Sequence, residues 1–278
     1  MIKDIVLHLS TGKGTRGTVD YAASVAVACG AHLAGVAFVL DPFVALGMGV
    51  GDITPPDWID EQREQAQAAA DAAIAAFEEA ARRNALSAES RRLDASLAGA
   101  PTIFGEIARR FDLAIVRQAQ ADRTPLEDLI VEAALFESGR PVLIVPYVQK
   151  EPLNLDRVMV CWDGSRTAAR AVGDAMPLLT RAKAVEVVTV LGDAGKSDEI
   201  AGADIAEHLA RHDLNVEIKR IPSIDGDVAD AILSHAADMG SELLVMGGYG
   251  HSRLREFILG GVTRGVLKTM TVPTFMSH

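Results

Sequence analysis

Short apolar runs alternate along this chain with longer, alanine-rich stretches of helical periodicity. Residues 2–9 (Ile-Lys-Asp-Ile-Val-Leu-His-Leu) and 157–162 (Arg-Val-Met-Val-Cys-Trp) have the composition of buried strands. Each is followed by a small polar turn, a helix pattern and a second apolar run. In the two halves these helices and second strands are predicted over residues 15–29 and 33–40, and over residues 166–180 and 185–191.

The end of the chain repeats the end of its first half. Residues 112–116 (Asp-Leu-Ala-Ile-Val) correspond to residues 242–246 (Glu-Leu-Leu-Val-Met), and a proline-marked apolar run follows at 140–146 and again at 272–276. Strands rich in Val, Ile and Leu that alternate with helices form parallel sheets covered on both faces. The sequence therefore predicts an α/β protein with a βαβαβαβαβ order in each half. The predicted domains are residues 1–150 and 151–278.

The first half is longer because of one insertion. Residues 41–56 form a stretch marked by glycine and proline, and a helix pattern rich in Ala, Gln and Glu follows over residues 57–83. The insertion leaves the carboxyl end of a predicted strand, which is the side where open parallel sheets bind ligands. It is either a surface loop that packs its own apolar residues or a lid or interface segment.

Composition and charge exclude several classes of protein. The chain has 278 residues, 49% of them hydrophobic, and a net charge of −11, which disfavours nucleic acid as a main partner. No apolar run reaches the length of a membrane span and no signal-peptide pattern is present, so we expect a cytoplasmic protein. Two cysteines cannot form a disulfide framework, which agrees with a reducing compartment.

The densest chemical signal follows the fourth predicted strand of the second half. Gly247 and Gly250 precede a short amphipathic piece, and Gly260 and Gly261 stand where a helical pattern resumes, with Thr263 in its first turn. Glycines at a helix N-terminus suit an anion such as phosphate, although such a cluster is also typical of a plain turn. The run is neither a P-loop nor a Rossmann fingerprint. Further donors in it are His251, Ser252, Arg253 and Arg255.

With these motifs the sequence resembles the universal stress protein family in its tandem, two-domain form. The ATP-binding signature of that family, Gly-x2-Gly-x9-Gly-Ser/Thr after the fourth strand, is matched at Gly247, Gly250 and Gly260. An aspartate after the first strand is a second hallmark, and Asp163 supplies it. The resemblance covers essentially the whole chain, with one domain in each half.

The resemblance implies two five-stranded parallel sheets with strand order 3-2-1-4-5 and helices on both faces. It also implies one adenine-nucleotide site. ATP is the expected ligand, and whether Mg²⁺ accompanies it is left open. The resemblance further implies that Asp163 reaches the adenine–ribose end and that the backbone around Val190 bonds the adenine edge. The residues implied around the phosphates are Gly247, Gly248, Gly250, Gly260, Gly261, Val262 and Thr263.

The chain departs from the family pattern at several positions. Gly261 replaces the Ser or Thr of the signature, which removes a hydroxyl that would bond phosphate. In the first half, Ser10 stands in place of Asp163, Arg117 to Gln120 in place of Gly247 to Gly250, and Asp128-Leu129 in place of Gly260-Gly261. We therefore predict a degenerate first domain and one nucleotide per chain.

Smaller candidates carry less weight. His208 and His212 lie at i and i+4 of a predicted helix, a spacing that can bind a metal, but no third ligand is near in sequence, and a solvated face is the simpler interpretation. His8 and Cys161 lie on predicted buried strands. The simpler interpretation of His8 is a core histidine, and that of Cys161 is a buried, unreactive thiol. The sequence has no Ser-His-Asp order of a hydrolase.

The leading hypothesis is a cytoplasmic stress-response protein that binds an adenine nucleotide and acts by binding or signalling. One alternative is a slow ATPase or self-phosphorylating protein that uses Ser252 or Thr263; another is a scaffold or sensor of an apolar ligand that uses residues 41–56. We expect no nucleic-acid or membrane partner. The resemblance also implies that the last strands of the two halves, residues 141–146 and 272–276, pair within the chain as an intramolecular pseudo-dimer. The aggregation liability of an exposed edge favours the same pairing. A homo-oligomer is left open.

Overall fold

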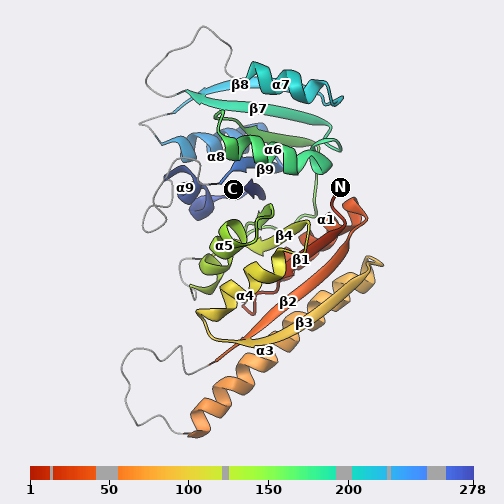
Figure 1. Ribbon diagram of the computed structural model, residues 1–278, viewed down its shortest axis with the longest axis vertical. Helices are drawn as coiled ribbons and strands as arrows, with labels where there is room; N and C mark the ends of the chain where they lie inside the picture. Colours follow the sequence, from red (N-terminus) through yellow and green to blue (C-terminus); the bar gives the residue numbers. More distant parts are fainter. Residues whose placement is uncertain (13–14, 42–55, 121–124, 192–201, 224–226, 249–260) are drawn as a thin grey trace. The chain divides into compact units, whose positions relative to one another are not determined.

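The computed structural model describes residues 1–12, 15–41, 56–120, 125–191, 202–223, 227–248 and 261–278 (Figure 1). By its internal contacts the chain divides into two compact units. One contains residues 2–140 and 150–152, and the other contains residue 1 and residues 141–149 and 153–278. The last strand of the first half therefore lies in the same unit as the second half.

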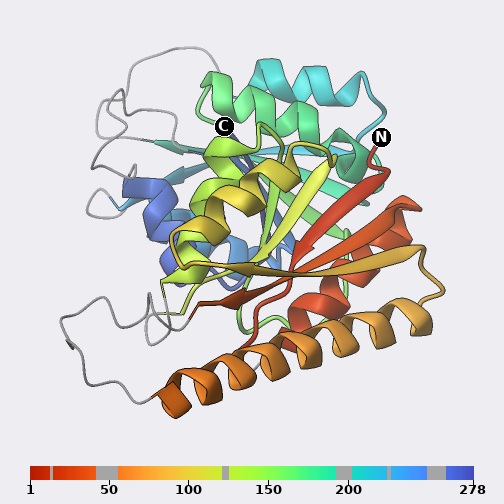
Figure 2. The same cartoon turned by 60° about the horizontal axis from the view of Figure 1, so that its bottom comes forward.

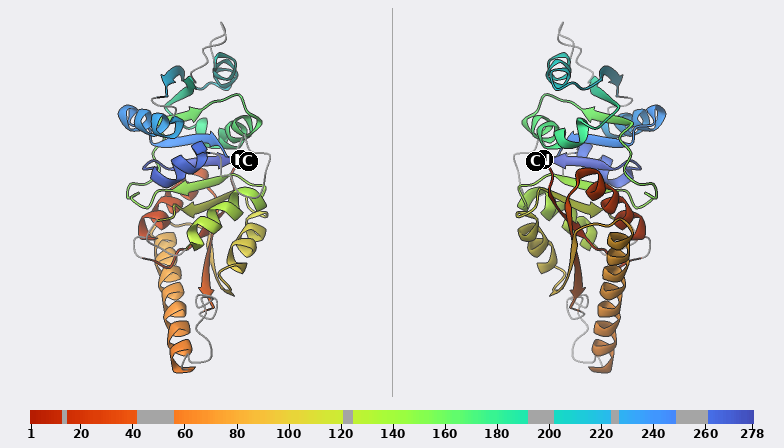
Figure 3. Two further views of the ribbon diagram at one scale, coloured as in Figure 1. Left: turned by 90° about the vertical axis from the view of Figure 1, so that its left-hand side faces the viewer. Right: turned by 90° about the vertical axis from the view of Figure 1, so that its right-hand side faces the viewer.

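The first unit is a parallel sheet of strand order β3-β2-β1-β4, with helices packed on it. The long helix α3 matches the helix predicted after the insertion and contacts β2, β3 and α1 (Figure 2). Its first turns extend past the carboxyl end of β2 (Figure 3). The insertion itself, residues 42–55, lies outside the described residues. The elements are β1 (Asp4–His8), α1 (Thr15–Cys29), β2 (His32–Leu40), α3 (Pro56–Arg83), β3 (Ala88–Ala95), α4 (Gly99–Ala108), β4 (Leu113–Arg117) and α5 (Leu126–Glu137).

The second unit has the strand order β8-β7-β6-β9-β10, and β5 (Val142–Val145) continues the sheet beyond β10. All neighbours are parallel except β5 and β10, which pair antiparallel with Phe275 opposite Leu143. The predicted pairing of the two last strands is thus confirmed. The other elements are β6 (Arg157–Cys161), α6 (Arg166–Leu179), β7 (Ala184–Leu191), α7 (Ala203–Ala210), β8 (Val216–Pro222), α8 (Val228–Met239), β9 (Leu243–Gly247), α9 (Gly261–Thr269) and β10 (Thr274–Ser277).

Burial explains why these segments form strands. Every residue of β4, β5 and β10 is buried, as expected of central strands covered on both faces. The edge strands β3 and β8 are mostly exposed and carry charged residues, which protects an open edge from pairing with other chains. The predicted α/β fold with parallel sheets covered by helices is confirmed.

Candidate functional site

The candidate site lies at the carboxyl edge of the second-half sheet. Strand β6 pairs with β7 on one side and with β9 on the other, all three parallel. Asp163 follows β6 by two residues, Val190 is the penultimate residue of β7, and Gly247 is the last residue of β9. Because parallel strands end at the same edge, the fold brings these three predicted site residues to one place.

Asp163 begins the turn that leads into α6. One of its carboxylate oxygens, Oδ1, accepts a hydrogen bond from the backbone N–H of Ser165 at 2.9 Å. Gly164 between them has a φ of +73°, a conformation that favours glycine. The N-cap of α6 is Ser165, whose side chain accepts from the backbone N–H of Ala168 at 3.1 Å. Asp163 is exposed at this edge, held by the turn without serving as the helix cap.

Gly247 is required by packing. A Cβ atom at this position would lie 2.6 Å from the backbone N of Ala168 and 2.6 Å from Oγ1 of Thr167, both in the first turn of α6. The sequence assigned this glycine to phosphate binding, and the structure adds the close approach of β9 to α6. The neighbouring Gly248 is buried and donates its N–H to the backbone O of Ser277 at 2.8 Å, so that N–H is already used.

The N-terminus of α9 supplies the described part of the second glycine segment. Gly261 is the first residue of α9 and is exposed, Val262 is half-buried, and Thr263 is buried with 4% of its surface exposed. A Cβ at Gly261 would meet no atom within 4 Å in the described part of the chain. The predicted site residues Gly250 and Gly260, and the candidate donors His251, Ser252, Arg253 and Arg255, lie outside the described residues.

Partly buried apolar side chains lie at the same edge and form what is called here the apolar wall. Cys161, Val190 and Val262 are all partly buried, and all pack against one cluster of buried residues from β6, β7, β8, β9 and α8. Burial, with a smaller contribution from the Asp163 carboxylate, raises the pKa of Cys161 to about 12. Cys161 is therefore a neutral thiol near pH 7 and contributes apolar surface to the wall. The cluster comprises Met159, Val188, Ile221, Ile232, Ala236 and Leu244.

Strand register identifies the corresponding positions in the first half. Ile5 pairs with Leu33 and Leu113 just as Val158 pairs with Val185 and Leu243. Residues at equal distances from these pairs along the equivalent strands occupy equivalent positions in the two halves. His8 corresponds to Cys161, Ser10 to Asp163, Phe38 to Val190, Arg117 to Gly247 and Gln118 to Gly248.

Large side chains fill these first-half positions. The ring of His8 lies 5.9 Å from that of Phe38 and 5.6 Å from that of Phe104 on α4, between ring centroids. His8, Phe38 and Arg117 are each 3% exposed. Sequence reasoning found Ser10 and Arg117 but missed the pair of His8 and Phe38. Alignment of the second strands of the two halves would have revealed it.

Over the described ranges, no group of three or more His, Cys, Asp or Glu side chains is arranged to hold a metal ion. The rings of His208 and His212 simply stack edge to face, with centroids 5.0 Å apart. Within the same ranges, no helix combines the length and the apolar character that crossing a membrane requires.

Comparison with known proteins relates the second half of the chain to one family. Residues 154–278 match the model of the universal stress protein family. The chain is 28% identical over 147 residues to universal stress protein Slr1230 of Synechocystis sp., a match that covers 51% of this chain and 48% of that protein. The chain thus spans about half the length of this curated relative.

Solved structures share the fold over both halves. A universal stress protein from Archaeoglobus fulgidus DSM 4304 superposes with a TM-score of 0.69 at 18% identity, over 99% of this chain and 97% of that one. A protein of unknown function from Pseudomonas aeruginosa PAO1 has a TM-score of 0.61 at 14% identity, over 99% and 92% of the two chains. Residues 154–278 are therefore a universal stress protein domain, which makes up the second half of the chain.

Proposed function

We propose that the second half of the chain binds an adenine nucleotide, with ATP as the expected ligand, and that the protein acts in a stress response through this binding. The observation that carries the proposal is the placement of Asp163, Val190 and Gly247 on three adjacent strand ends. This edge, where the strand order reverses direction, is the usual ligand site of an open parallel sheet.

Each part of a nucleotide has a matching chemical group at this edge. The half-buried side chains of Val190 and Val262 offer apolar surface to a flat base. The exposed carboxylate of Asp163 can accept hydrogen bonds from ribose hydroxyls. The N-terminus of α9 offers backbone N–H groups and the positive end of a helix dipole to phosphates. Among the described residues, no atom lies within 4 Å of a Cβ placed at Gly261.

The proposed site includes the residues implied by the family resemblance. In the described part of the chain, the binding residues would be Asp163, Val190, Gly247, Gly248, Gly261, Val262 and Thr263; Gly250 and Gly260 complete the proposal. Because the N–H of Gly248 is bonded to Ser277, Gly248 would contribute close backbone approach and no hydrogen bond from its N–H. Mg²⁺ would bind together with the nucleotide phosphates, as it commonly does in nucleotide sites.

The proposal assigns binding to the second half alone. In the first half, Phe38 and His8 occupy the positions of Val190 and Cys161, and the buried Arg117 occupies the position of Gly247. A base and a phosphate would need the space that these side chains fill. We therefore propose a cytoplasmic protein whose first domain is a degenerate copy of its second.

The experiment is calorimetric titration of the purified protein with ATP, combined with native mass spectrometry of freshly purified protein to detect retained nucleotide. Asp163→Ala should weaken ATP binding by about tenfold or more, the equivalent of one hydrogen bond to a charged group. Asp163→Asn keeps an acceptor for the Ser165 N–H and separates the ligand contact from the turn. Glu207→Ala, which changes an exposed helix carboxylate on α7, is the matched control.

The outcomes separate the alternatives. Absence of ATP binding by the wild-type protein would refute the proposed function and leave the scaffold or apolar-ligand hypothesis. Equal affinity of the wild type and Asp163→Ala would refute the role of Asp163. Steady phosphate release or transfer of radiolabel from ATP to the protein would establish the enzymatic alternative. Thr263, a candidate acceptor in that alternative, is 4% exposed, which disfavours transfer to its hydroxyl.

A further inference from the structure

Helix α9 carries two groups of the proposed nucleotide site. Val262 in its first turn packs against the same buried cluster as Val190 of the apolar wall. The first N–H groups of a helix have no acceptor within the helix, and in α9 these include the N–H groups of Gly261 and Val262. The placement of α9 therefore determines both the position of one part of the wall and the distance from these N–H groups to a bound phosphate.

A glycine lies in the interior of this short helix, about one turn after Gly261. Gly265 is the fifth of the nine residues of α9. Glycine is less favourable than alanine in a helix interior, because it loses more backbone freedom on folding. Gly265 is half-buried and is not among the described glycines of positive φ, so its backbone conformation does not require glycine. A packing requirement has to explain it.

Close packing against α8 supplies that requirement. Helices α8 and α9 lie side by side (Figure 1), and a Cβ atom at Gly265 would lie 2.6 Å from Cβ of Ala229, the second residue of α8. Ordinary contacts begin at 3.4 Å. Because a Cβ atom cannot rotate away from its own backbone, Gly265→Ala would separate the two helices by about 0.8 Å, the difference between these distances.

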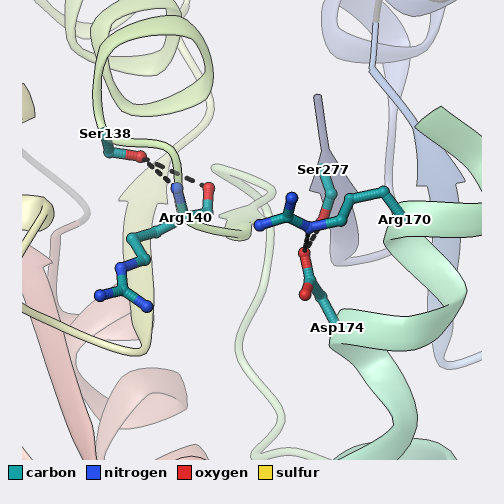
Figure 4. Close-up of polar contacts among 5 residues, drawn as sticks. All are labelled: Ser138, Arg140, Arg170, Asp174 and Ser277. Atoms are coloured by element: carbon teal, nitrogen blue, oxygen red, sulfur yellow. Dashed lines mark hydrogen bonds and ion pairs between the residues drawn. The ribbon is translucent and has the colours of Figure 1, made fainter. Parts of the chain in front are cut away.

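Helix α6 provides a matched control on the opposite face of the sheet. Gly247 of β9 contacts α6, whereas Leu244, an odd number of residues earlier, packs in the cluster with α8, so the two helices cover different faces. An anchor of its own holds α6 to β10, because Oδ2 of Asp174 accepts a hydrogen bond from Oγ of Ser277 at 2.9 Å (Figure 4). The neighbouring Gly173 is exposed, and a Cβ there meets no described atom within 4 Å.

We propose that Gly265 and Ala229 are positioning residues whose contact holds α9 where Val262 and the N-terminal N–H groups meet a bound nucleotide. The inference rests on the proposed function, since it concerns the same site. Backbone N–H groups bond oxygen over about 2.7–3.2 Å, so a displacement of about 0.8 Å takes such a bond out of range. Neither Gly265 nor Ala229 needs to touch the ligand for this effect.

The test is calorimetric titration of the full chain with ATP. We expect Gly265→Ala to bind ATP about tenfold more weakly than the wild type, the equilibrium effect of losing one hydrogen bond to a charged group. Gly173→Ala adds the same methyl group to α6 and should change the affinity less than about twofold. Denaturant unfolding of each variant is measured in parallel, because a contact that only stabilised the fold would shift the unfolding transition and leave the affinity of the folded protein unchanged.

A compensating exchange separates the contact between the helices from other effects of the methyl group. In the double variant Gly265→Ala/Ala229→Gly, the methyl group moves from α8 to α9, so the overlapping pair of Cβ atoms no longer exists. Its ATP affinity should return to within about twofold of the wild type. Ala229→Gly alone creates no overlap, and its loosened contact should weaken ATP binding about threefold.

The outcomes are distinguishable. Equal ATP affinity of Gly265→Ala and the wild type would overturn the inference, as would an equal loss in Gly173→Ala or a double variant as weak as Gly265→Ala. If Gly265→Ala failed to fold, wild-type affinity in Ala229→Gly would overturn it instead. Absence of ATP binding by the wild-type protein would remove the proposed function together with this inference, whereas wild-type binding with any of these results refutes the inference alone.

Discussion

The glycine at the end of β9 can be tested by adding a single methyl group. In Gly247→Ala the new Cβ would lie 2.6 Å from the backbone N of Ala168, against an ordinary contact of 3.4 Å or more. The two elements would have to separate by about 0.8 Å, the difference between these distances, to relieve the overlap. Because one of the overlapping atoms belongs to the backbone of α6, a change of rotamer cannot relieve it.

The expected cost follows from two opposing terms. Overpacking of a closely packed contact typically costs about 1–3 kcal/mol. Replacing glycine by alanine also reduces the entropy of the unfolded chain, which stabilises the folded state by about 0.4–1 kcal/mol where the backbone tolerates it. The described backbone does not place Gly247 among the residues of positive φ, so no conformational strain is added. The free energy of unfolding should therefore fall by about 1–2 kcal/mol.

The assay is denaturant unfolding of both variants beside the wild type, with Gly261→Ala as the matched control. Gly261 is the first residue of α9, and a Cβ there meets no described atom within 4 Å. Alanine is the better helix former by about 1 kcal/mol, so this variant should be as stable as the wild type or more stable. If Gly247→Ala proved as stable as Gly261→Ala, the close approach of β9 to α6 would not exist as described.

Two further predictions concern the first half. Burial lowers the pKa of His8 to about 4 from the ordinary 6.5. Between these two pH values the unfolded chain therefore binds more protons than the folded chain. The free energy of unfolding should fall by about 3 kcal/mol as the pH drops from 6.5 to 4. In His8→Gln the free energy of unfolding should not show this loss between pH 6.5 and 4. Equal pH profiles for the variant and the wild type would refute the role of His8. Calorimetry of the intact chain should give one nucleotide per chain, and two equivalent sites would show that the first half retains a working site.

Local patterns in the sequence predicted most of the elements. The helix expected over residues 15–29 is α1 (Thr15–Cys29), and the helix expected after the insertion is α3. These segments are long and strongly periodic, and their ends carry polar or glycine-rich turns. The pairing of β5 with β10 was predicted from the family resemblance together with an argument about exposed edges, although the residues lie far apart in the chain.

The chemistry of the site was predicted less completely, because it depends on distances across the fold. The glycine motif and Asp163 form recognisable patterns in the chain. The close approach of Gly247 to α6 and the contact of Asp174 with Ser277, 103 residues away, leave no local pattern. A motif shows which residue types are present, whereas only the register of strands and helices shows which atoms meet.

The first half shows what happens when such an edge is filled by side chains. An open ligand site needs small side chains at the strand ends, such as Cys161 in the proposed site, and a small side chain gives up packing that a larger one would provide. In the first half the ring of His8 packs near two phenylalanine rings at the corresponding edge, which replaces that opening with buried aromatic surface. The sheet is preserved because its strands remain apolar, while the site depends on a few positions at their ends. Under the proposed function, the same fold would therefore serve as a binding domain in the second half and as a closed, self-packed domain in the first.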